Sequence, residues 1–426
     1  MLMQKLLKKC DFLRCYCSNR IVMSVGDASH GALGLPSSPM QLGGDAYEPT
    51  PIPALPSNIS TIGAGHYHSL AVTSQGQVWA WGRNYEFQLG RLNPNTSDDN
   101  QPMMVHGLNQ IQVTSVSASG VVSTAIGEDG SLWVWGKSKR GQLGLGTGLI
   151  ESPLPSRVQA LAGEHVVKVS LGWGHALAYT KDGKLFGWGY AADGRLGHIG
   201  LALDSSRRTS FKTTGEPLLD LADKMVLELM EKENEMPIVW EPSLLLELQD
   251  AHVVDVACGD DHSLVLCSNG TLLSSGSNTY GQLGRSSADF GMLPVDIRFS
   301  PVSISSGLGH CLAVCQIPDT SESSNDIVTW GWNRNSQLGR EGPENIPEIV
   351  QGLEGQTHVS TSGGRAHSLA LTSEGEVFAW GCGKNGRLGL GSSNDEVEPA
   401  LLDCLQGSKV LQAVSGYDHN LVLVAQ

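Results

Sequence analysis

The chain has 426 residues and a formal net charge of −15 at pH 7. Glycine makes up 52 of the 426 residues, or about 12%, against a usual share of about 7%. Only 17% of the residues are charged, and no apolar run approaches the ~20 residues of a membrane-spanning helix, which excludes a disordered acidic chain, a coiled coil and a membrane span. The acidic balance argues against a general nucleic-acid binder. Length alone suggests two or three domains, whereas abundant glycine and ten tryptophans indicate many short strands and turns.

Residues 1–20 precede the first recurring unit and are basic. They carry Lys5, Lys8, Lys9, Arg14 and Arg20 against Asp11, and Leu2, Met3, Leu6, Leu7, Cys10 and Leu13 fall on one helical side. A basic, acid-poor amphipathic N-terminus resembles a mitochondrial presequence, which predicts a mitochondrial location. Two alternatives stay open: a basic tail that contacts nucleic acid, or a variable start without a targeting function, with the cytoplasm or nucleus as the location.

From residue 21 onward the chain repeats one pattern seven times. A glycine, in five cases preceded by tryptophan, is followed eight residues later by a second glycine that leucine precedes. The first glycines are Gly26, Gly82, Gly136, Gly189, Gly276, Gly331 and Gly381. They are spaced 56, 54, 53, 87, 55 and 50 residues apart, which is typical of four-stranded propeller blades.

A second block, Gly-x-x-His, precedes most of these glycines. Its histidines are His68, His175, His262, His310, His367 and His419, and the copy at residues 119–122 has lost both glycine and histidine. Because one histidine recurs per unit, symmetry distributes them around a ring. This favours hydrogen bonding within each turn over a metal site or an acid–base array. We expect no metal and no cofactor.

Each unit is predicted to form four short strands. In the unit around residue 80, a strand over 69–72 reaches a tight turn at Gln75-Gly76, and the next strand over 78–81 runs into Trp-Gly. The N-terminus holds only the second half of a unit, 21–35, and the C-terminus only the first half, 410–424. We therefore predict one all-β domain over 21–426, a seven-bladed β-propeller closed by pairing of the N- and C-terminal strands in one blade.

The 87-residue spacing marks an insertion at about residues 198–250. Apolar residues at helical spacing predict an amphipathic helix over 217–232, and 216–250 holds ten Asp or Glu against two Lys. The helix either packs on the ring or docks a partner. The candidate contacts for a partner are Leu218, Met225, Leu229, Glu228 and Glu231.

The recurring blocks resemble those of the regulator of chromosome condensation family. They include Gly259–Ser263, WGRNYEFQLG at 81–90, WGKSKRGQLG at 135–144 and WGWNRNSQLG at 330–339, and the resemblance covers nearly all of residues 21–426. It implies the seven-bladed propeller. The family includes a chromatin-bound guanine-nucleotide exchange factor for a small GTPase, a plant ultraviolet-B photoreceptor, and organelle proteins tied to RNA processing and respiratory-chain assembly, so fold does not settle function.

The sequence favours a non-enzymatic module that binds proteins. Neither a G-x-S-x-G nucleophile elbow nor a phosphate-binding loop is present. The leading hypothesis is an exchange-factor-like regulator of a small GTPase. Its candidate partner-binding residues are Asp260, Asp261, Asp418, Arg365 and Trp173.

Three other functions remain as alternatives. A mitochondrial adaptor that supports RNA processing, splicing or respiratory-complex biogenesis comes second, and a structural scaffold is less favoured. A photoreceptor is also less favoured, because Trp173 is the one indole among the first variable residues of the Gly-x-x-His turns. Nucleic acid is expected to be contacted only indirectly or through the N-terminal tail.

Overall fold

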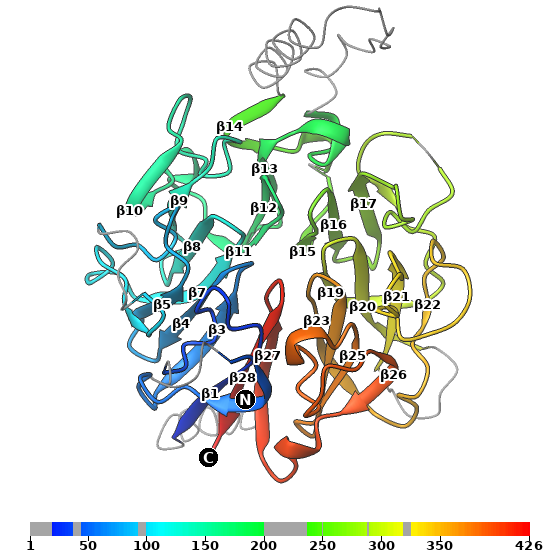
Figure 1. Cartoon of the computed structure of the whole chain (residues 1–426). Coiled ribbons are helices and arrows are strands. Elements are labelled where there is room, and N and C mark those ends of the chain that lie inside the picture. The colour runs from blue at the N-terminus through cyan, green and yellow to red at the C-terminus, as the bar shows by residue number, and fades with distance from the viewer. Residues whose placement is uncertain are drawn as a thin grey trace, which may run out of the picture.

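Seven antiparallel sheets of four strands stand around a common centre in the computed structural model, which describes residues 19–36, 44–92, 99–199, 237–248, 250–287, 289–317 and 325–426 (Figure 1). In each sheet the strands follow one another in space, from the innermost to the outermost. This confirms the predicted all-β, seven-bladed propeller. Within the described ranges, no helix has the length and apolar character needed to cross a membrane.

The strands fall into four sets by their position in the blade. The innermost strands are β3 (Ile59–Ala64), β7 (Val113–Ala118), β11 (Val166–Leu171), β15 (Val253–Cys258), β19 (Ser300–Ser306), β23 (His358–Gly363) and β27 (Lys409–Ser415). The second strands are β4 (His68–Thr73), β8 (Val122–Gly127), β12 (His175–Thr180), β16 (His262–Cys267), β20 (His310–Gln316), β24 (His367–Thr372) and β28 (His419–Ala425).

The third and fourth strands complete the blades, which we number 1 to 6 from β3 and 7 for the blade that joins the chain ends. The third strands are β5 (Val78–Gly82), β9 (Leu132–Lys137), β13 (Leu185–Tyr190), β17 (Leu272–Gly276), β21 (Asn325–Gly331), β25 (Val377–Gly381) and β1 (Arg20–Gly26). The fourth strands are β6 (Met103–Met104), β10 (Glu151–Arg157), β14 (Ile238–Leu244), β18 (Leu293–Pro294), β22 (Glu348–Ile349), β26 (Glu396–Leu401) and β2 (Ala46–Pro51). Short 3-10 helices lie at Gln159–Leu161, Ala192–Gly194, Leu246–Leu248, Lys384–Gly386 and Asp403–Leu405.

Blade 7 is built from both ends of the ring. Strand β1 pairs with β28 in an unbroken antiparallel register from Arg20 opposite Ala425 to Gly26 opposite His419. Strand β27 then pairs with β28, and β2 with β1. The predicted closure is confirmed, and it leaves neither β1 nor β28 as an exposed edge.

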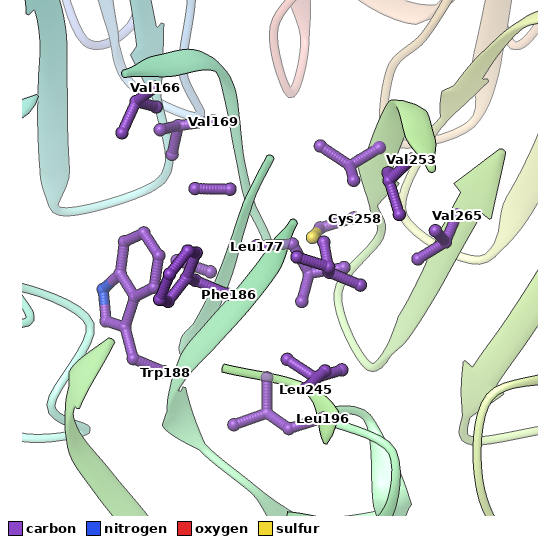
Figure 2. Close-up of a cluster of buried hydrophobic side chains, with 14 of the residues drawn as sticks. Val166, Val169, Leu177, Phe186, Trp188, Leu196, Leu245, Val253, Cys258 and Val265 are labelled. Carbon is purple, nitrogen blue, oxygen red and sulfur yellow. The ribbon is translucent and has the colours of Figure 1, made fainter. Parts of the chain in front are cut away.

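Apolar contacts between neighbouring blades form the core. Strand β12 of blade 3 and β16 of blade 4 are almost entirely buried, which explains their near-continuous apolar sequences. Figure 2 shows one such cluster, in which Leu177 of blade 3 lies beside Cys258 of blade 4, and Trp188 lies beside Phe186 within blade 3. Because each blade covers the next, the seven sheets cannot be separated without exposing this surface.

The eight-residue spacing between the paired glycines has a structural cause at five of the seven blade junctions. The five tryptophans of the Trp-Gly dipeptides are buried, and each indole Nε1 donates to a backbone carbonyl of the preceding blade, as Trp380 does to Gln337 at 2.9 Å. The second glycine lies beneath that indole, since a Cβ on Gly339 would come within 2.8 Å of Trp380 Nε1.

The first glycines of the pairs end the third strand of each blade. Gly82 has φ +109°, and a Cβ there would lie 2.6 Å from the carbonyl oxygen of Tyr67, so neither the backbone nor the available space accepts a side chain. The same positive φ occurs at the equivalent positions Gly136, Gly189, Gly276, Gly331 and Gly381.

The insertion lies in the connection between the third and fourth strands of blade 3. Residues 238–244, inside the range predicted for the insertion, form β14 of that blade. The predicted helix over 217–232 lies outside the described residues, with its candidate contacts Leu218, Met225, Leu229, Glu228 and Glu231. Most of the N-terminal segment, residues 1–18, also lies outside them.

Candidate functional site at the turn face

All seven turns between first and second strands open on one face of the ring, which we call the turn face. The connections between third and fourth strands open on the same face, because successive strands are antiparallel. The seven inner strands enclose a central cavity of about 510 Å³. Glycines of these turns, including Gly65, Gly172 and Gly259, line one of its mouths. The variable residues of the turns therefore surround that mouth.

The six repeat histidines bind the neighbouring blade. Each buried Nε2 lies within hydrogen-bond distance of a side chain of the next blade. The pairs are His68–Ser123 at 2.7 Å, His175–Ser263 at 2.9 Å, His262–Ser306 at 2.8 Å, His310–Ser368 at 3.0 Å, His367–Asn420 at 2.7 Å and His419–Ser69 at 2.9 Å. These bonds join blades, whereas we expected bonds within each turn.

The hydroxyls fix the protonation state of these rings. Ser368 Oγ donates its hydrogen to Gln337 O at 2.8 Å, so it accepts from His310, and Nε2 carries the imidazole proton. Burial lowers the pKa of His68, His262, His310 and His367 to about 3 and that of His419 to about 4, and it lowers the pKa of His175 well below its ordinary value. At neutral pH the six rings are uncharged donors.

An aromatic cluster lies at the channel mouth on the turn face. His66 stacks on Trp173 with ring centroids 5.6 Å apart and planes 20° apart, and it lies 4.7 Å from Tyr417. These residues come from blades 1, 3 and 7. Blade 2 lies between the first two and contributes Gly120, where a Cβ would come within 3.0 Å of His66 Nδ1. Burial lowers the pKa of His66 to about 4, so this ring is neutral as well. Trp173 is 41% exposed and reaches solvent.

Arginines surround the aromatic cluster. The Arg140 guanidinium lies 5.7 Å from the Trp173 ring centre and 5.3 Å from that of Tyr190, within cation–π range. Arg365 lies 5.0 Å from the ring centre of Tyr417. Both contacts hold a cation against an aromatic face at the channel mouth.

The three predicted aspartates have different environments. Asp261 Oδ1 lies 2.7 Å from Arg195 Nη1, and Asp418 Oδ1 lies 3.0 Å from Arg365 Nε and 2.5 Å from the buried Arg387. Burial raises the pKa of Asp418 although both arginines lower it. Burial and the charge of Asp261 together raise the pKa of Asp260 to about 7, so about half of its carboxyls carry a proton at neutral pH.

The structure thus brings Asp260, Asp261, Asp418, Arg365 and Trp173 to the turn face of the ring, where Asp260 and Arg365 line the central cavity. Their common location does not test whether they bind a partner, so that role stays a prediction. The candidate set omitted Arg140 and Arg195, which lie in the connections between third and fourth strands. Their spacing after Trp-Gly and before Leu-Gly could have marked them as facing the turns. Among the described residues, no three His, Cys, Asp or Glu side chains are placed to hold a metal ion.

The blade repeats, the Gly-x-x-His turns and the closed ring match a known family. The RCC1-like domain matches residues 21–422. The chain belongs to the RCC1-like domain family. This RCC1-like propeller is similar to the ultraviolet-B receptor UVR8 of Arabidopsis thaliana, with 30% identity over 91% of this chain and 79% of the receptor. It is also similar to the mouse secretion-regulating guanine nucleotide exchange factor, with 30% identity over 70% of this chain and 61% of that protein.

A solved structure has the same fold. Prp20p from Saccharomyces cerevisiae, described together with its binding to Gsp1p and histones, superposes with a TM-score of 0.75 over 96% of this chain and 92% of Prp20p. Its sequence identity to this chain is 20%, so the likeness concerns the fold.

Proposed function

We propose that this RCC1-like propeller is a non-enzymatic protein-binding module that regulates a small GTPase in the manner of a guanine-nucleotide exchange factor. The partner docks on the turn face, around the channel mouth. The observation that carries the proposal is the cluster around Trp173, an exposed indole held between His66 and Arg140 on a rigid ring.

The composition of this cluster supports a docking role. Tryptophan, tyrosine and arginine are enriched among the residues that dominate the binding energy of protein interfaces. Tryptophan and tyrosine bury a large area with only two side-chain torsions to fix. Here the stacked His66 and the guanidinium of Arg140 restrain Trp173 before any partner arrives. A preorganised side chain loses less conformational entropy on binding.

The aspartates suggest how nucleotide release is promoted. An exchange factor must weaken the contacts of the GTPase to phosphate and magnesium, and a carboxylate competes with phosphate for the cationic groups that bind it. Asp261 and Asp418 already pair with arginines of this chain. Asp260, with its pKa near 7, can release a proton and become a carboxylate when a partner cation approaches.

Two relatives support the choice of partner. The mouse relative is a guanine nucleotide exchange factor by name, and Prp20p is described as binding Gsp1p and histones. The ultraviolet-B receptor has the same 30% identity over a larger share of this chain, 91% against 70%. In this chain, however, Trp173 stacks on an imidazole, and among the described ring contacts no second indole lies against it. Excitonic coupling between indoles therefore lacks a partner at this position.

The test is release of a fluorescent guanine nucleotide from a panel of small GTPases. We expect the full chain to accelerate release from at least one of them, and Trp173→Ala and Asp260→Asn to reduce that acceleration by about tenfold or more. Val397→Ala is the matched control, because Val397 is exposed on the outer strand of blade 6, far from the channel mouth. Failure of the full chain on every GTPase of the panel would overturn the proposal.

A second candidate is a mitochondrial adaptor for RNA processing or respiratory-complex biogenesis, which the basic amphipathic residues 1–20 favour. It predicts that a protein tagged at its C-terminus co-localises with a mitochondrial marker. It also predicts that loss of residues 1–18 disperses the tagged protein. Residence of the full-length tagged protein in the cytosol contradicts this candidate, and exchange activity in the purified chain is not required by it.

A further inference from the structure

The inner strands begin on the face of the ring opposite the turns, which we call the far face. Each inner strand contains one β-bulge near its start, where one residue falls out of register with the second strand. The bulged residues occupy the same place in every blade. They are Ser60, Thr114, Val167, Val254, Val302, Val359 and Leu411. A bulge re-aims a side chain and bends its strand, and the seven bulges form a ring at the starts of the inner strands, on the far face.

Five consecutive blades place an aliphatic residue at this position. We call Val167, Val254, Val302, Val359 and Leu411 the aliphatic collar. Each is between 36% and 48% exposed. The inner strands that carry them follow one another around the centre of the ring (Figure 1). The two remaining blades have Ser60 and Thr114 at the same position, so the geometry of the bulge does not require an aliphatic side chain.

An arc of exposed aliphatic residues is costly in water, because its apolar surface stays hydrated. Singly exposed valines need no explanation, whereas a contiguous apolar patch on a folded chain marks a surface that binds something. Val167 also lines the central cavity, so the collar continues into the channel.

The charges around the collar indicate what it binds. The hairpins between second and third strands open on the same face. Those of blades 2 and 6 are acidic, with Glu128, Asp129, Glu374 and Glu376, whereas that of blade 3 carries Lys181 and Lys184 beside Asp182. Glu164 lies in the connection into blade 3 and pairs with Lys184. An apolar arc beside acidic hairpins complements a segment that carries aliphatic and basic side chains together.

We propose that the aliphatic collar is a second docking surface, which binds an amphipathic basic segment of a partner protein. Aliphatic side chains of that segment cover the collar, and its lysines or arginines face the acidic hairpins. The propeller then holds two partners at once, one on each face of the ring. This surface is independent of the exchange-factor proposal, since it shares no residue with the turn-face cluster.

The test uses two fluorescent peptides of equal length and leucine pattern, one with lysine and the other with glutamate at the polar positions. Anisotropy is measured with the full-length chain. We expect the leucine–lysine peptide to bind and the leucine–glutamate peptide to bind at least about tenfold more weakly. The double variant Val302→Thr/Val359→Thr should weaken the first peptide about tenfold, because two apolar contacts are lost.

Threonine is the matched replacement, since Thr114 occupies this bulge in blade 2. An unchanged midpoint of thermal unfolding shows that the double variant is folded. Trp173→Ala, on the opposite face, should leave peptide binding unchanged. Equal binding of the two peptides, or full binding by the double variant, overturns the proposal. Collar-dependent binding of a peptide of residues 1–18 that displaces the leucine–lysine peptide also overturns it, because the occupant would then belong to this chain.

Discussion

Six of the seven blade junctions contain a polar bond from a buried imidazole, and the junction between blades 2 and 3 does not. There Val122 takes the place of histidine, and Ala176 takes the place of the serine that would accept its proton. Both residues are fully buried and belong to one apolar cluster. Gln142 adds two bonds across this junction, from Nε2 to Gly172 O at 2.7 Å and to His175 O at 3.0 Å.

The comparison shows that the junction requires matched partners and not histidine itself. A buried donor without an acceptor costs the full desolvation of the group, whereas an apolar pair of fitting shape costs little. The change of histidine to valine in one blade therefore goes with the change of serine to alanine in the next. The carbonyl of Gln142 still accepts from Trp188 Nε1 at 2.8 Å, so the indole bond survives the exchange.

The largest expected effect is a loss of folding stability at low pH, which comes from the six junctions that contain a buried imidazole and not from the Val122 junction. The folded-state pKa of the six imidazoles lies below the unfolded value of about 6.5, so stability is complete above pH 6.5 and is lost as pH falls toward 3. Between these two pKa values, each imidazole lowers the free energy of unfolding by up to about 1.4 kcal/mol for each unit that the pH falls. We expect the chain to unfold well above pH 3, as followed by tryptophan fluorescence in denaturant at several pH values. Stability that stays constant from pH 7 to pH 5 would contradict the neutral buried rings.

The next effect comes from building the apolar pair into a second junction. Ser368→Ala leaves the buried His310 donor without its acceptor and should cost about 1–3 kcal/mol, and His310→Val should cost a similar amount through the space it leaves. The double variant should cost at least about 1 kcal/mol less than the sum. Denaturant unfolding of all four proteins measures this coupling. Strict additivity would show that the pair is not a unit.

The special role of Gln142 predicts a smaller difference. Gln142→Leu removes two bonds across the junction and should destabilise the chain by about 1–3 kcal/mol. Gln282→Leu is the matched control, because the Gln282 side chain accepts a hydrogen bond within its own loop, from the backbone N–H of Tyr280 at 2.8 Å. We expect the control to cost less in denaturant unfolding. If both variants lose the same unfolding free energy, Gln142 stabilises its own loop and not the junction between blades 2 and 3.

The smallest effect concerns Asp260, whose charge opposes that of the imidazoles. Its folded-state pKa near 7 lies above the unfolded value, so its contribution is complete below about pH 4 and is lost as pH rises through 7. The unfolding free energy of Asp260→Asn, relative to that of the wild type, should therefore be about 1 kcal/mol higher at pH 8 than at pH 5, after allowance for the partial exposure of Asp260. Unfolding free energies at those two pH values measure it. A constant difference would show that Asp260 titrates normally.

The ring could be predicted because the seven copies of one pattern can be recognised in the sequence without any three-dimensional information. The same symmetry predicted that His310 is structural in role, but the predicted bond within the turn was wrong. Its acceptor, Ser368, lies 58 positions away, and only the packing of one blade on the next brings the two together.

The cluster at the channel mouth was predicted in part. Trp173, Asp260 and Arg365 lie in the variable places of the turns, which the repeat identifies. Arg140 was missed because the residue type at its position differs from blade to blade, with Glu86 and Asn335 in the equivalent places. The stacking of His66 on Trp173 depends on the small residues of blade 2 between them, which no spacing reveals. The aliphatic collar was also missed, because a bulge interrupts the alternation that sequence patterns use.

Closure by β1 and β28 has a consequence for how the chain is made. The ribosome releases Arg20 about 400 residues before its pairing partner Ala425. Blades 1 to 6 can form as they emerge, but the sheet of β1 stays incomplete until all six of those blades have been synthesised. The last strand of the ring to leave the ribosome is thus the one that pairs with the first, and the interval before that pairing is when a chaperone would have most to protect.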